Sequence, residues 1–127
     1  MNALEYITKT LAFFDEDPDR WISGRLAQDA LGLGCSADSP GAVGWCAIGG
    51  LCKTAKVSSA ITAPPSLMQA MDALNDAVIK HEQTGEYEGL DLDLDLAWFN
   101  DSKKSWAEVR PVFLDAIIDL RHNRSAA

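Results

Sequence analysis

Two adjacent glycines inside an expected helix constrain the fold of this chain more than any other feature. The sequence predicts a helix from about Pro40 to Lys56, and Cys46, Gly49 and Gly50 lie on one face of it. Each glycine costs about 1 kcal/mol relative to alanine in a helix interior, so close packing should compensate. We therefore expect another part of the chain to press against the two glycines.

Apolar residues repeat at three- and four-residue spacing in three other segments, which is the pattern of an amphipathic helix. The predicted helices cover residues 3–14, 66–83 and 105–120. Residues 121–127 are predicted to fray, as chain ends commonly do. A length of 127 residues suits one domain. We therefore expect a single, mainly α-helical domain over residues 1–127, built as a compact bundle of about four helices.

A different pattern occupies residues 90–99, where leucines alternate with aspartates. Alternation with a period of two predicts a half-buried extended segment. Such a segment needs a partner for its backbone hydrogen-bonding groups, and residues 21–27 are the plausible partner. The expected fold therefore includes a short two-stranded extended pair.

The chain is acidic, with 19 aspartates and glutamates, 11 lysines and arginines and a formal net charge of -8. Basic side chains provide the affinity for nucleic-acid phosphates, and anionic membrane surfaces also attract basic segments. We therefore expect no direct binding to nucleic acid and no binding to membranes. An acidic surface suits a protein partner with a basic surface, such as the nucleic-acid channel of another protein.

The sequence indicates the cytoplasm as its location. No apolar run approaches the ~20 residues needed to cross a bilayer. Residues 1–5 lack the basic region and the cleavage site of a signal peptide. The three cysteines are an odd number, which argues against a framework of disulfides.

Cys46 is the residue to test as a nucleophile, because a cysteine becomes reactive where its surroundings favour the thiolate. His81 would be the base, and Asn100 or Asp101 would orient it. This set would make the chain a cysteine-dependent hydrolase or transferase. Cys46 lies about six residues into the predicted helix, however, past the turn where the dipole acts strongly. His81 lies in a polar run. A buried structural thiol and a solvated histidine are therefore the favoured interpretations.

A second cluster, residues 98–101, combines two aromatic residues with two turn-forming polar residues. Asparagine and aspartate often fix a loop by bonding to nearby backbone, so a structural role is favoured. The alternative is that Asn100 or Asp101 faces a pocket near Cys46. We expect this turn and the glycine face of the helix to meet, as a packed contact or as walls of a pocket. The candidate binding residues are Trp45, Gly49, Gly50, Trp98, Asn100 and Asp101.

No metal site and no cofactor are predicted. Cys35, Cys46, Cys52 and His81 lack the paired spacing of zinc ligands. The aspartates of residues 91–96 match the first half of an EF-hand loop but fail its glycine and glutamate positions. The glycines follow no predicted strand, so a nucleotide-binding loop is also not indicated.

Several short motifs have a recognisable order: Trp21-x-x-Gly24, Trp45-Cys46-Ala47-Ile48-Gly49-Gly50, and Trp98-x-Asn100-Asp101 before Glu108-Val109. Together they resemble a family of small uncharacterised bacterial and phage proteins of unknown function. That family has the pattern Trp-Cys-x-x-Gly-Ala, followed by Trp-Asn-Asp and a helix with Glu-Val. The resemblance extends from the first helix to Val109. It implies a shared fold and a bacterial or phage context, and it implies no reaction.

Three classes of function remain open. The leading hypothesis is a small non-enzymatic accessory protein that binds another protein, and an acidic, phage-encoded inhibitor of a host defence system is one version of it. The first alternative is the cysteine-dependent hydrolase or transferase centred on Cys46. The second is a small-molecule-binding domain with a pocket beside Gly49 and Gly50.

Overall fold

Helices make up most of the structure. The computed structural model describes residues 1–82 and 95–126. In chain order its elements are α1 (Ala3–Glu16), η1 (Pro18–Arg20), β1 (Ala27–Asp29), β2 (Ala42–Trp45), α2 (Ala47–Ala55), η2 (Ala60–Thr62), α3 (Pro65–Glu82), α4 (Leu96–Asp101) and α5 (Trp106–Ala126). The prediction of a mainly α-helical fold with a short extended pair is confirmed. Among the described residues, none of the helices combines the length and the apolar character needed to cross a bilayer.

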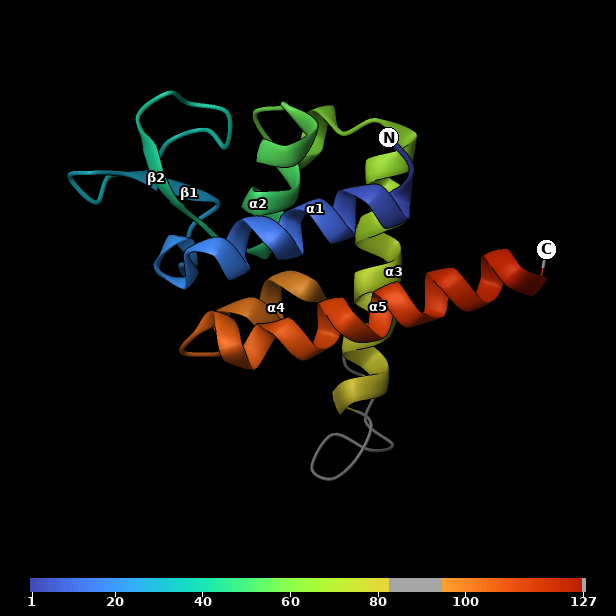
Figure 1. Cartoon of the computed structure of the whole chain (residues 1–127). Coiled ribbons are helices and arrows are strands. Elements are labelled where there is room, and N and C mark those ends of the chain that lie inside the picture. The colour runs from blue at the N-terminus through green and yellow to red at the C-terminus, as the bar shows by residue number, and fades with distance from the viewer. Residues whose placement is uncertain (83–94, 127) are drawn as a thin grey trace.

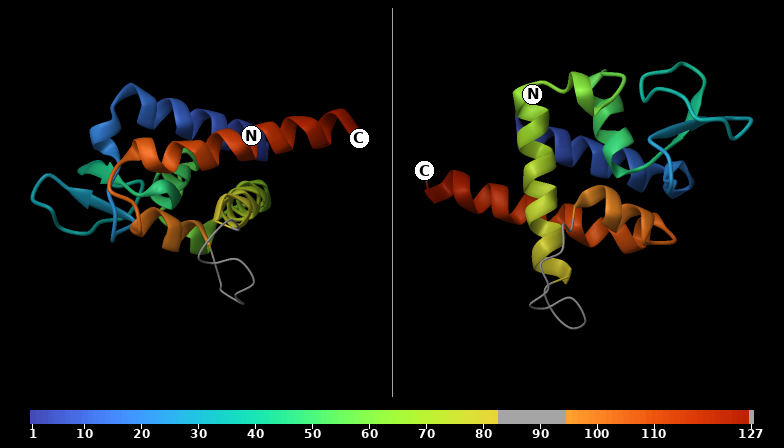
Figure 2. Two further views of the ribbon diagram at one scale, coloured as in Figure 1. Left: turned by 90° about the horizontal axis from the view of Figure 1, so that it is seen from below. Right: turned by 180° about the vertical axis from the view of Figure 1, so that it is seen from behind.

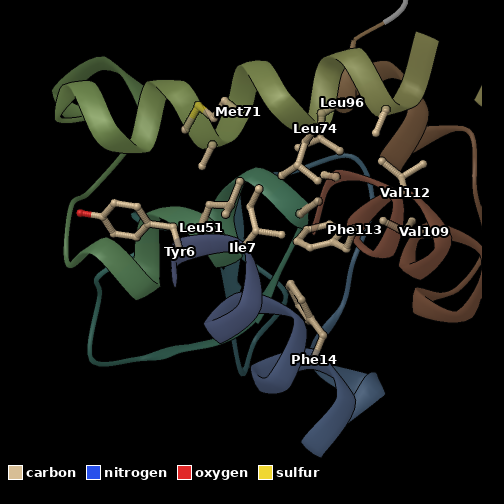
Figure 3. Packing of buried hydrophobic residues seen from close by; sticks show 14 of the residues in the cluster. Tyr6, Ile7, Phe14, Leu51, Met71, Leu74, Leu96, Val109, Val112 and Phe113 are labelled. Carbon is tan, nitrogen blue, oxygen red and sulfur yellow. The ribbon is translucent and has the colours of Figure 1, made fainter. Parts of the chain in front are cut away.

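The core forms where α1, α3 and α5 meet. α1 and α5 lie side by side and run in opposite directions, and α3 crosses both of them (Figure 1 and Figure 2). Ile7 of α1, Leu74 of α3 and Phe113 of α5 are fully buried between these helices (Figure 3). The short helices α2 and α4 contact each other beside this core, and the two strands project from one end of the molecule (Figure 1).

Three predicted helices are confirmed with changes at their ends. The helix predicted over residues 3–14 is α1, and the one predicted over residues 66–83 is α3. α5 contains the helix predicted to end near Leu120, with Pro111 inside it. It continues to Ala126, so residues 121–126, which the sequence predicts to fray, are helical.

The helix predicted from Pro40 to Lys56 is wrong in its first half. Residues 42–45 form β2, which pairs with β1 in the antiparallel direction, and α2 begins at Ala47. The packing around β2 is tight, because a Cβ at Gly44 would lie 2.8 Å from Cγ2 of Ile22. Pairing with a distant segment has therefore overridden the helical spacing of the sequence.

The extended segment predicted over residues 90–99 is also corrected. Residues 90–94 lie outside the described residues, and the remainder belongs to α4 and its cap. The side chain of Asp95 accepts a hydrogen bond of 2.8 Å from the backbone N–H of Trp98 and so caps α4. The last residues of the alternating segment therefore form the start of α4 and not a strand. The observed strand pair consists instead of β1 and β2.

The exposed carboxylate of Asp15 joins the end of α1 to the start of α5. Asp15 accepts a hydrogen bond of 2.7 Å from Nε1 of Trp106 and also bonds to the guanidinium of Arg110, at 3.0 Å from Nε and 3.0 Å from Nη2. The bond to Arg110 holds the pKa of Asp15 below its ordinary value, against the opposing effect of burial, and the Trp106 bond lowers it further. The charged form of Asp15 is thus the form that links the two helices.

Gly49 and Gly50 face two different neighbours, which explains why both positions lack a side chain. A Cβ at Gly49 would overlap the backbone carbonyl oxygen of Leu26, just before β1. A Cβ at Gly50 would lie 2.5 Å from Cε2 of Phe14. The expectation that another part of the chain presses on this helix is therefore confirmed, and it is met by a backbone segment on one side and by an aromatic ring on the other.

Replacing Gly49 by alanine is expected to lower the free energy of unfolding by about 3 kcal/mol, because the added methyl group meets a backbone carbonyl that cannot rotate away. Urea denaturation measures the change. Gly34→Ala is the matched control, since a Cβ there has no heavy atom within 4 Å. It should change stability by less than about 0.5 kcal/mol. Equal effects of the two substitutions would contradict the close approach of Leu26 to α2.

Candidate functional site

The buried side chain of Asn100 connects the segments that carry the sequence motifs. Its Oδ1 accepts hydrogen bonds from Nε1 of Trp21, at 2.6 Å, and from the backbone N–H of Ala47, at 3.0 Å. Its Nδ2 donates to the carbonyl oxygen of Ile22, at 3.1 Å, and to Oδ1 of Asp101, at 3.2 Å. All four hydrogen-bonding positions of the amide are therefore used within the chain. We call Asn100 a structural joint, meaning a side chain that holds separate segments of the chain together.

Asp101 extends this joint to the loop that precedes β1. Its Oδ1 accepts a hydrogen bond of 2.8 Å from the backbone N–H of Gly24. Gly24 has a φ of 83°, a conformation that favours glycine. The carboxylate itself is exposed, so it can also face a ligand.

The expected meeting of the glycine helix with the turn at residues 98–101 takes place at the start of α2. The contact is the hydrogen bond between Asn100 and Ala47. The glycines themselves pack elsewhere, against Leu26 and Phe14. The two segments therefore form a packed contact, and the glycine face does not line it.

The two tryptophans among the candidate binding residues belong to the packing of the fold. Trp45 is buried, and its Nε1 donates a hydrogen bond of 2.9 Å to the carbonyl oxygen of Ala37. Its ring packs edge-on against Phe13, with 5.0 Å between the ring centroids. Trp98 is half-buried and packs against the hydrophobic core.

A small pocket of about 220 Å³ lies beside Cys46. It is lined by Gly24, Arg25, Leu26, Cys46, Ile48, Ala97, Asn100 and Asp101. Three of the candidate site residues, Cys46, Asn100 and Asp101, thus share one surface. The pocket is smaller than the roughly 300–1,000 Å³ of common small-molecule sites.

Cys46 has a different structural position from the one predicted. It is the N-cap of α2, and its Sγ accepts a hydrogen bond of 3.3 Å from the backbone N–H of Gly49. Burial raises the pKa of the thiol, the backbone N–H groups of Gly49 and Ile48 oppose this rise, and the charge of Asp101 adds to it. Burial outweighs the helix terminus, so the thiol of Cys46 is protonated at neutral pH.

The proposed base, His81, packs on another side chain. It is exposed near the end of α3, and its ring lies edge-on against Phe99 with 5.6 Å between the ring centroids. The pocket beside Cys46 is lined by other residues. Within residues 1–82 and 95–126, no group of three or more histidines, cysteines, aspartates or glutamates is arranged to hold a metal ion.

A larger hollow, which we call the α3–α5 groove, has a volume of about 680 Å³. Its lining consists of Gln69, Asp72, Ala73, Asp76, Ile79 and Lys80 of α3 and Asp119, Leu120, His122 and Asn123 of α5. The residues that line it come from α3 and from the last part of α5. This part of α5 projects past α3 (Figure 2). The core-facing stripe of α3 gives no sign of this groove, which lies on the exposed face of the helix. The available signal was the row Asp72, Asp76 and Lys80, spaced four residues apart.

A solvent-exposed ion pair links the two walls of this groove. Nζ of Lys80 lies 2.8 Å from Oδ2 of Asp119, which links α3 to α5. The hydrogen bond to Asp119 raises the pKa of Lys80, and the charges of Asp119, Asp76 and Asp115 raise it further, while desolvation opposes the rise. Asp119, with the nearby charges of Asp76 and Asp115, therefore favours the charged ammonium of Lys80.

Replacing Asn100 by alanine is expected to lower the free energy of unfolding by about 2–4 kcal/mol, because the indole N–H of Trp21 and the backbone N–H of Ala47 lose their acceptor. Chemical denaturation followed by tryptophan fluorescence measures this loss. Asn123→Ala removes an exposed amide from α5 and should be nearly neutral. A nearly neutral Asn100→Ala would show that Asn100 is not a structural joint.

Iodoacetamide at about pH 7.5 is expected to label Cys35 in the native protein and to leave Cys46 and Cys52 unmodified until urea unfolds the chain. Cys35 is half-buried, whereas Cys46 and Cys52 are buried. Burial raises the pKa of Cys52 to about 11. Peptide mass spectrometry locates the label, and Cys35→Ser should remain unlabelled. Fast labelling of native Cys46 would restore it as a candidate nucleophile.

The motif residues therefore hold separate segments of the chain together, and a hollow larger than the pocket beside Cys46 is the acidic α3–α5 groove. No family model, curated protein or solved structure matches the chain.

Proposed function

We propose that this chain is a small acidic accessory protein that acts by binding a positively charged protein, and that the α3–α5 groove is its binding surface. The groove itself is the observation that carries the proposal. It is about 680 Å³ in volume and combines the carboxylates of Asp72, Asp76 and Asp119 with the apolar side chains of Ile79 and Leu120. Carboxylates beside apolar surface match a partner that presents lysine or arginine next to apolar groups.

The charge balance of the groove supports a cationic partner. Three aspartates line it, and Lys80 is their positively charged neighbour through its pair with Asp119. The net charge of the whole chain, -8, has the same sign. Long-range attraction therefore steers basic surfaces toward this protein and speeds their association.

The two alternative functions receive less support. The thiol of Cys46 is buried and its pKa is raised, which disfavours the thiolate that a nucleophile needs. The amide of Asn100 is fully used in hydrogen bonds within the chain. The pocket beside Cys46 is about 220 Å³, a third of the volume of the groove. None of these three observations favours catalysis or a small-molecule site over protein binding.

The resemblance of the sequence motifs to small bacterial and phage proteins suggests the setting of this activity. Nucleic-acid-handling systems of a bacterial host expose basic channels, and an acidic protein can occupy such a channel. A phage-encoded inhibitor of a host system is the version of the proposal that combines this setting with the acidic groove.

The proposal is tested by identifying a partner and reconstituting the complex. Tagged protein captures partners from a bacterial lysate, and the captured protein is purified and titrated by calorimetry. We expect a basic protein whose affinity falls about five- to tenfold for the double variant Asp72→Asn and Asp76→Asn, because two exposed ion pairs of about 0.5–0.7 kcal/mol each contribute about 1.0–1.4 kcal/mol together. The affinity should also fall as salt is added.

A matched variant separates the groove from the general charge of the chain. Asp19 and Asp38 are exposed and do not line the groove. The double variant Asp19→Asn and Asp38→Asn changes the net charge by the same amount and should bind the partner within about twofold of the unmodified protein. Equal losses in the two double variants would show that the groove is not the binding surface. A purified partner with an acidic surface would overturn the proposal as a whole.

A further inference from the structure

The α3–α5 groove is long and has a wall at its side. Its residues on α3 extend from Gln69 to Lys80, a distance of about 16 Å, or about three helical turns, at ~1.5 Å per residue. α5 crosses α3, and the end of α5 projects beyond it (Figure 1 and Figure 2). A bound segment of similar length can therefore lie along α3 and rest its side on α5.

The lining favours a helix over an extended strand as the bound segment. Both walls are sides of helices, whose backbone N–H and C=O groups are bonded within the helices themselves. An extended peptide binds most favourably at a sheet edge, where free backbone groups pair with its own. A helix satisfies its backbone internally and binds through side chains alone, as grooves between helices require.

The spacing of the groove residues sets the pattern of the partner. Asp72 and Asp76 lie one turn apart on the same face of α3. Ile79 and Leu120 supply apolar surface from the two walls. A helix packed along α3 therefore matches this lining when basic residues four positions apart face the aspartates and an adjoining stripe of apolar residues faces Ile79 and Leu120.

We infer that the α3–α5 groove binds a basic amphipathic helix of about three turns, supplied by the protein partner, with lysine or arginine at positions i and i+4. This inference rests on the proposed function and specifies the bound segment. The ammonium of Lys80 already sits on Asp119, so the groove contains an internal example of the contact that the partner would make. Lys80 is also a like charge that repels the incoming helix.

The experiment uses two synthetic peptides of about 14 residues that have the same composition of lysine, leucine and alanine. One peptide places lysine and leucine on separate helical faces, and the other alternates them with a period of two. Fluorescence anisotropy with the full chain gives the dissociation constants, and circular dichroism measures the helicity of the bound peptides. We expect the helically patterned peptide to gain helicity and to bind about tenfold more tightly than its isomer.

Three variants of the chain assign this binding to the groove. The double variant Asp72→Asn and Asp76→Asn should weaken binding about five- to tenfold, and the double variant Asp19→Asn and Asp38→Asn should stay within about twofold. Lys80→Gln should strengthen binding about two- to fivefold, because it removes the repelling charge and frees Asp119. The substituted side chains are exposed, and circular dichroism verifies that each variant is folded.

The outcomes separate this inference from the proposed function. Equal binding of the two peptides, both lost with Asp72→Asn and Asp76→Asn, would overturn the helical partner and leave the acidic groove in place. Binding that is indifferent to these aspartates, or no binding, would overturn the inference, while the proposed function stands or falls on the purified partner. Self-association of the chain that disappears with the same double variant, measured by sedimentation, would make a second copy the occupant and would also overturn the inference.

Discussion

The buried amide of Asn100 is the interaction on which the arrangement of the smaller elements depends. It receives hydrogen bonds from Trp21 and from Ala47 at the start of α2, and it donates to the carbonyl oxygen of Ile22. These contacts join α4, α2 and the segment before β1, which are far apart in the sequence. The amide oxygen accepts from N–H groups, and the amide nitrogen donates to oxygen atoms. A residue of similar size without both functions would therefore leave buried polar groups without partners.

The long helices were predictable from the sequence because their apolar spacing continues over several turns. α1 and α3 bury the stripes that include Ile7 and Leu74, and the same rule locates most of α5. The short elements were not predictable, because contacts with distant segments decide them. Residues 42–45 form the strand β2 because they pair with β1. Asp95 caps the helix α4, although it lies in a segment whose alternation indicates a strand.

The same difference applies to the candidate sites. The motif residues Cys46, Asn100 and Asp101 do lie around one small pocket. They were predictable as candidates because each belongs to a short local motif in the sequence. Sequence could not show that Cys46 caps α2, since that depends on where the strand before it ends. The α3–α5 groove could not be predicted from the sequence for another reason. Asp76 and Asp119 line the same groove only because α3 and α5 pack against each other.

The contact of Asp15 with Trp106 and Arg110 makes the packing of α1 against α5 depend on pH. Because the folded pKa of Asp15 lies below the unfolded one, the folded chain binds fewer protons there than the unfolded chain does. The stabilisation is complete above the ordinary pKa of an aspartate and is lost as the pH falls through the lowered, folded value. Protonation would remove the charge that holds Arg110, so acid loosens the end of α1 from α5 at a position remote from the acidic groove.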